Sequence, residues 1–159
     1  MITKEEARAK CLTFLREQNE GVLATATTLG KPFASCIYYA VDDEFNIYFL
    51  TSRATNKFKN ISLNKEVAFV VGTGPEYLTA QIQGICDIVP DGEFEKATSL
   101  LLEVESRHPM MHWPIHAIKS LDEKGLVLLK VTPSFVSFLT INSKAYPESN
   151  ANYFYQIIP

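Results

Sequence analysis

The feature that most constrains this chain is a run of short strand-like segments that begins near Val22. β-Branched and aromatic residues alternate with turn signals, a pattern typical of antiparallel strands. The segments are "VLATATT", "FASCIYYAV", "IYFLT", "EVAFVVGT", "YLTAQIQGICDIV" and "GLVLLKVTPSFVSFLTI". We expect the first three to form a meander, and Pro133 to divide the last into two strands. Five to seven antiparallel strands with few helices predict a small closed or partly open β-barrel, because closure removes unpaired strand edges.

Helices are expected at three places. Thr3 and Glu6 form a capping box ahead of an amphipathic helix, Thr55 can cap a short helix, and helical spacing recurs between residues 91 and 107. The apolar, aromatic tail "ANYFYQII" is expected to pack on the barrel or on a partner chain. We predict a single domain over residues 1–159: an N-terminal helix (1–20), core strands with their polar loop (21–90), a helix (91–107), and an irregular loop, closing strands and tail (108–159).

Charge and cysteine content argue against several classes of protein. The formal net charge is −3, so the chain lacks the basic face that binding to a nucleic-acid backbone requires. The first residues are polar, and no run is apolar and long enough to span a membrane. Cys11, Cys36 and Cys86 are odd in number and far apart, so neither a disulfide framework nor a zinc site is expected. A cytoplasmic protein with no nucleic-acid or membrane partner fits best.

The polar loop "LTSRATNKFKNI", residues 50–61, collects hydroxyls and cations but no acidic residue. If a helix begins after Thr55, its positively polarised start carries further positive charge, which is unfavourable unless an anion binds there. A phosphate could contact the free N–H groups, the hydroxyls of Thr51, Ser52 and Thr55, and the cations of Arg53 and Lys57. A solvated loop that leads into a basic helix start explains the segment about equally well.

Several motifs, in order and spacing, resemble the FMN-binding split barrel of the pyridoxamine 5′-phosphate oxidase-like family over about residues 20 to 90. They are Leu23-Ala24-Thr25, Gly30-Lys31-Pro32, Tyr48-Phe49-Leu50-Thr51, Lys57-Phe58-Lys59-Asn60-Ile61, Asn64 with Val67, and Gly84. The resemblance implies a mainly β fold, an antiparallel split β-barrel of Greek-key type with flanking helices. It also implies FMN at a homodimer interface, with the phosphate on the polar loop and helix start.

The family motifs assign expected roles to individual residues. Thr51 and Lys57 stand at phosphate-contacting positions, with Ser52 beside them and Arg53 as a further cation. The strand whose backbone would border the flavin ring contains Ser35, Cys36 and Ile37. Members that oxidise pyridoxamine phosphate usually carry cations where this chain has Ser35, Ala40 and Asn56. That activity is therefore not expected here.

A second cluster, "RHPMMHWPIH", places His108, His112 and His116 four residues apart. Pro109 and Pro114 disfavour a continuous helix, so an irregular loop is favoured over a metal or haem site, and no metal is expected. Trp113 is a candidate cover for the open face of a flavin across the dimer interface, or else a core or interface anchor.

The sequence thus favours an FMN-binding protein, a small flavin-dependent oxidoreductase acting on a small-molecule redox substrate. It identifies no general acid or base, so the catalytic residues are unknown and catalysis itself is an open question. The alternative is a non-catalytic flavin, deazaflavin or haem binding protein on the same fold, or a member that has lost its cofactor.

Overall fold

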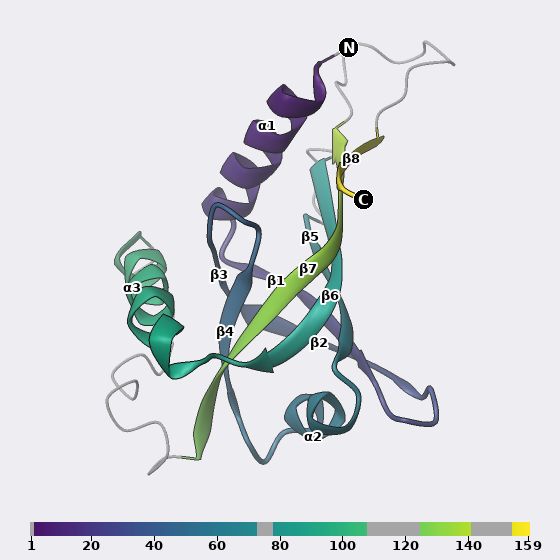
Figure 1. The fold of residues 1–159 in the computed structure, drawn as a ribbon, viewed down its shortest axis with the longest axis vertical. Coiled ribbons are helices and arrows are strands. Elements are labelled where there is room, and N and C mark those ends of the chain that lie inside the picture. Colours follow the sequence, from purple (N-terminus) through teal and green to yellow (C-terminus); the bar gives the residue numbers. More distant parts are fainter. Residues whose placement is uncertain (1, 73–77, 108–124, 141–153) are drawn as a thin grey trace.

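The computed structural model describes residues 2–72, 78–107, 125–140 and 154–159 (Figure 1). The described helices are α1 (Lys4–Glu17), α2 (Asn56–Leu63) and α3 (Asp91–Arg107). The described strands are β1 (Glu20–Ala26), β2 (Pro32–Tyr38), β3 (Ala40–Val41), β4 (Ile47–Ser52), β5 (Glu66–Val71), β6 (Leu78–Ile88), β7 (Leu126–Thr140) and β8 (Phe154–Ile158).

All of these strands belong to one antiparallel sheet that curls into a half-barrel (Figure 1). The strand order is β2-β1-β5-β6-β7-β4-β3, and β8 pairs with the C-terminal part of β7. β2 and β4 lie on opposite arms of the sheet, yet their Cα atoms come within 8 Å of each other without a shared ladder. The predicted mainly β, split-barrel architecture is confirmed, and the split lies between these two strands.

The predicted meander is only partly correct. β1 and β2 form a hairpin, but the third run, β4, pairs with β7 and with the short β3 rather than with β2. The second run is divided at Tyr39, where the chain passes from one edge of the sheet to the other. Tyr39 is 1% exposed, and its hydroxyl donates a hydrogen bond to Leu15 O at 2.7 Å. The end of α1 therefore holds this crossing in place.

The predicted break at Pro133 is wrong, because β7 is one strand of 15 residues. Pro133 lies opposite Gly84 at a bulge, where the register between β6 and β7 shifts. A Cβ atom on Gly84 would lie 2.1 Å from Thr132 O, so only glycine allows the two backbones to approach this closely. The bulge accommodates a residue that cannot donate to the ladder.

The predicted helices are confirmed. Thr3 and Glu6 exchange both capping-box hydrogen bonds, and Thr55 caps α2. The predicted packing of the tail on the barrel is also confirmed, since β8 pairs with β7. One apolar cluster fills the barrel between the sheet and α1, and a second lies between β4 and α3. No helix in the described ranges is long and apolar enough to cross a bilayer.

Candidate functional site

The loop between β4 and α2 is built by its own hydroxyl groups. Thr55 Oγ1 donates to Ser52 O at 2.8 Å and accepts from Phe58 N at 3.3 Å. Its single proton is thereby used, so in the 3.2 Å contact between the two threonine hydroxyls Thr51 is the donor. Ser52 Oγ accepts from Ala54 N at 3.2 Å. These hydroxyls shape the turn. Their contact with a phosphate, one of the two explanations that the sequence left open, is still a prediction.

The start of α2 has the reversed charge that the sequence predicted. Its first turn contains no acidic residue and includes Lys57, and Lys59 lies two residues further along the helix. Thr55 satisfies the N–H of Phe58, whereas the N–H groups of Asn56 and Lys57 have no intrahelical acceptor because they belong to the first turn. Positive side chains and unsatisfied donors meet at one helix end, and this combination attracts an anion.

A cysteine of β2 lies within the electrostatic influence of this helix start. Cys36 points outward, with its Sγ 3.8 Å from Glu20 Oε2. Partial burial raises the pKa of the Cys36 thiol, the Glu20 carboxylate raises it further, and the charge of Lys57 opposes both. Lys57 is therefore near enough to act on β2. Among the described strands β2 is an edge, so part of its backbone N–H and C=O groups face away from the sheet.

Ser35 and Ile37 lie on the other face of β2. They pair with Leu23 and Gly21 of β1, and Leu23 is fully buried in the barrel. Ile37 is buried as well, and Ser35 is half-buried. The three residues predicted on this strand are thus split between the barrel interior and the outer face, because successive strand side chains alternate.

Arg53 lies against the first turn of α2. Its guanidinium carbon is 5.4 Å from the centre of the Phe58 ring, and its backbone N–H donates to Gly125 O at 2.9 Å. No local sequence signal points to this carbonyl, because Gly125 is distant in sequence and precedes β7. Nor does one point to the buried hydrogen bond from Asn60 Nδ2 to Thr25 Oγ1, 3.1 Å, which fixes α2 to β1.

The structure therefore brings together Thr51, Ser52, Arg53 and Lys57 at the start of α2, and places Cys36 within electrostatic reach of Lys57. Trp113, His108, His112 and His116 lie outside the described residues. Within the described part of the chain, no three His, Cys, Asp or Glu side chains gather as metal ligands.

Comparison with known proteins gives a family match over most of the chain. Residues 7–139 match the family model described as pyridoxamine 5′-phosphate oxidase. The chain is also 32% identical over 108 residues to a 5a,11a-dehydrotetracycline/5a,11a-dehydrooxytetracycline reductase of Streptomyces rimosus subsp. rimosus. That alignment spans 63% of this chain and 76% of the reductase.

Solved structures share the fold at lower identity. A heme binding protein from Mycobacterium smegmatis superposes with a TM-score of 0.68 at 17% identity, over 84% of this chain. The match spans 53% of that protein, so this chain corresponds to about half of it. A FAD-binding protein from Mesorhizobium loti gives a TM-score of 0.62 at 19% identity, over 82% of this chain and 91% of its own. The two neighbours are named for different cofactors, so the shared fold does not identify the ligand.

Proposed function

The chain belongs to the pyridoxamine 5′-phosphate oxidase family, and on this premise we propose that it is an FMN-dependent oxidoreductase acting on a small organic substrate. The observation that carries the proposal is the cationic start of α2, whose Lys57 acts electrostatically on Cys36 of the edge strand β2. Lysines at a helix N-terminus destabilise the empty protein. A bound phosphate group reverses the sign of that effect.

The groups around this helix start fit the two ends of FMN. The phosphate would be held by the N–H groups of the first turn of α2, by Lys57 and by Arg53. Ser52 can add its hydroxyl proton, which has no acceptor within the described residues. The backbone edge of β2 around Cys36 offers the alternating donors and acceptors that the ring's polar edge requires. When bound, FMN supplies hydride and electron transfer, while this chain's residues bind and orient it.

We infer that a second copy of the chain completes the site. Among the outward side chains of β1, β2 and β5 is a group of small apolar ones, each half-exposed or exposed: Val22, Ala24, Ala34, Ala68 and Val70. Cross-strand pairing places Ala34, Ala24 and Ala68 in one continuous row. This row lies on the same face as Cys36, so a partner seated on it would also cover the flavin edge of β2. Trp113 as a cover for the ring is still a prediction.

The dimer can be tested separately from the cofactor. Ala68→Glu places a charge at the centre of the row and should convert a dimer into a monomer in light scattering, with a loss of FMN retention. Ser99→Glu, on the exposed side of α3, is the matched control and should change neither. A wild-type chain that is monomeric at all concentrations would rule out the shared site.

The substrate is expected to lack a phosphate group. The three positions where family oxidases usually carry cations hold a half-buried serine, a buried alanine and an exposed asparagine: Ser35, Ala40 and Asn56. Ala40 is 2% exposed in the apolar cluster under α3, a place unsuited to a charge. The related Streptomyces protein, named as a 5a,11a-dehydrotetracycline/5a,11a-dehydrooxytetracycline reductase, supports reduction of a small organic substrate.

The same missing cations favour a second candidate function. A site with fewer phosphate contacts could hold a deazaflavin, a haem or a flavin without turnover, and the fold neighbours are named for both haem and FAD. In this alternative the chain is a binding protein without catalysis.

The visible absorption spectrum of the untagged protein distinguishes these functions. It should be recorded as purified, and again after addition of FMN and dialysis. A retained, protein-shifted two-band spectrum that is bleached by a nicotinamide donor and restored by a substrate supports the oxidoreductase. A retained flavin that no donor bleaches supports the binding protein, and a single intense Soret band supports haem. A colourless protein that loses added FMN contradicts the proposal.

A further inference from the structure

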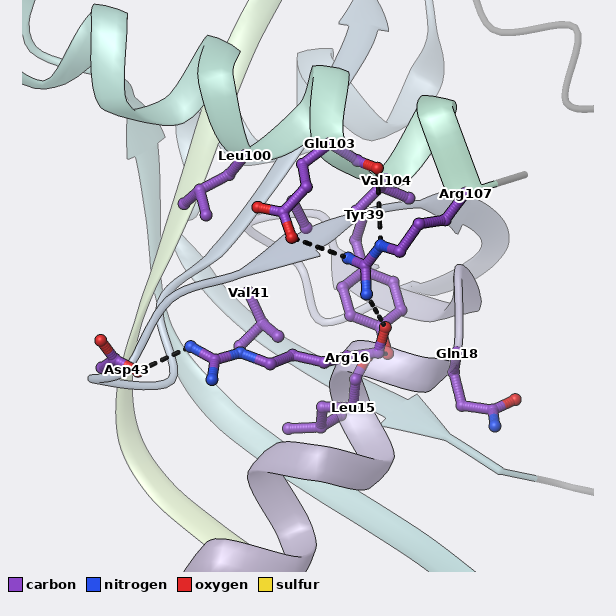
Figure 2. A pocket seen from close by; sticks show the side chains of 11 residues that line it. Leu15, Arg16, Gln18, Tyr39, Val41, Asp43, Leu100, Glu103, Val104 and Arg107 are labelled. Carbon is purple, nitrogen blue, oxygen red and sulfur yellow. Dashed lines mark hydrogen bonds and ion pairs between the residues drawn. The ribbon is translucent and has the colours of Figure 1, made fainter. Parts of the chain in front are cut away.

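A cavity of about 330 Å³ lies away from α2, where the end of α1, β3 and the second half of α3 meet (Figure 2). Leu15, Tyr39, Ala40, Val41, Leu100 and Val104 form one apolar wall, and polar side chains contribute the rest of its lining. The one polar atom of the tyrosine is already bonded, since its hydroxyl donates to Leu15 O. The volume is at the lower end of the range for small-molecule sites.

Charged side chains form the rim of this cavity. Arg16 from α1 and Arg107 from α3 both line it, as do Asp43 and Glu103 (Figure 2). Arg16 Nη2 contacts Asp43 Oδ1 at 2.6 Å, but the aspartate side chain is 85% exposed. Exposed ion pairs of this kind contribute little to stability. A ligand could therefore replace this carboxylate at low cost.

Arg107 is held more loosely than Arg16. Its Nη1 donates to Arg16 O at 3.3 Å, its Nε reaches Glu103 O at 3.5 Å, and its Nη2 is 3.8 Å from Glu103 Oε1. All three distances exceed the usual range for a good N–H···O hydrogen bond. A guanidinium has five N–H donors in a planar fork that matches a carboxylate, so its three long contacts within the described residues leave Arg107 able to bind one.

We propose that this cavity is a binding site for a small monocarboxylate with an apolar body. The apolar wall takes the body, and the carboxylate replaces Asp43 on Arg16 or binds the fork of Arg107 at the rim. A single negative charge is specified because Asp43 and Glu103 rim the same opening and would repel a dianion. The site is formed by other elements than the proposed FMN site, and either can exist without the other.

The test is calorimetric titration of the purified full chain with phenylpropionate, and with its neutral amide as the matched probe. Phenylpropionate should bind saturably, and the amide should bind about tenfold or more weakly, since hydrogen bonds to charged groups are the stronger ones. Arg16→Gln and Arg107→Gln should together reduce the affinity for phenylpropionate by about tenfold or more. Lys10→Gln removes an exposed charge from α1, the helix of Arg16, and should leave the affinity unchanged.

A filling variant tests the cavity itself. Leu100→Trp should abolish binding while circular dichroism shows a folded protein, and backbone NMR shifts on binding should centre on Tyr39, Val41 and Val104. Equal affinity for acid and amide, absence of saturation at concentrations on the order of ten millimolar, or unchanged binding by the arginine variants would overturn the proposal. Competition between phenylpropionate and FMN would also overturn it, since the site would then be the one at α2.

Discussion

Lys57→Glu should stabilise the cofactor-free protein and weaken FMN binding at the same time. A cation in the first turn of a helix costs about 0.3–1 kcal/mol, and an acid there gains a similar amount. Reversing the charge of half-buried Lys57 should therefore raise the free energy of unfolding by about 0.6–2 kcal/mol. For a chain of this length that corresponds to a rise in Tm of roughly 1–8 °C. The cofactor-free protein is therefore expected to be more stable without Lys57.

The same substitution should lower FMN affinity by a larger free energy. A charge-assisted hydrogen bond to the phosphate is worth about 1.5–3 kcal/mol, and the new carboxylate adds repulsion, so the Kd should rise by about tenfold to several hundredfold. Thermal unfolding of the empty protein and quenching of FMN fluorescence measure the two effects. Lys59→Glu, exposed and two residues further along α2, should change both less. Unchanged FMN affinity in Lys57→Glu would refute a phosphate site at this helix start.

Further predictions concern the fold and the strand edge. Gly84→Ala should lower the free energy of unfolding in urea by about 1–3 kcal/mol, because its Cβ would meet backbone at 2.1 Å, whereas Gly92→Ala, with open space around it, should not destabilise. Burial alone would raise the pKa of Asp42, but hydrogen bonds from neighbouring groups outweigh it and hold that pKa below its usual range. The stability that this carboxylate contributes should therefore be present above about pH 4 and lost as the pH falls further. Asp42→Asn should show less of that loss in urea titrations at several pH values. Glu20→Gln should lower the raised pKa of Cys36 and speed its alkylation at mildly alkaline pH, and an unchanged rate would mean that the carboxylate does not act on the thiol.

The parts of the fold that sequence reasoning predicted correctly depend on near neighbours. The cap of α2 by Thr55 is set by residues within three positions, and so is the reversed charge at its start. The errors arose where a distant segment decides the outcome. Pro133 stays inside a strand because Gly84 lies opposite, and β4 pairs with β7 because the barrel closes through residues far along the chain. The local sequence around Pro133 or β4 does not indicate that its partner is Gly84 or β7.

The candidate site shows the same division between local and distant causes. Hydroxyls and cations lie close together in the sequence and also in the structure. The two groups have different roles, because Thr51 and Thr55 form hydrogen bonds with each other and within the turn. Within the described residues, the first N–H groups of α2 have no intrahelical acceptor and the proton of Ser52 has none, while Lys57 and Arg53 add positive charge for an anion. Such a loop is rigid before any ligand arrives, because Asn60 also fixes α2 to Thr25 in the core. The helix start that carries Lys57 is therefore held in place by contacts that do not depend on a ligand, and an anion can bind there without a further cost of ordering the loop.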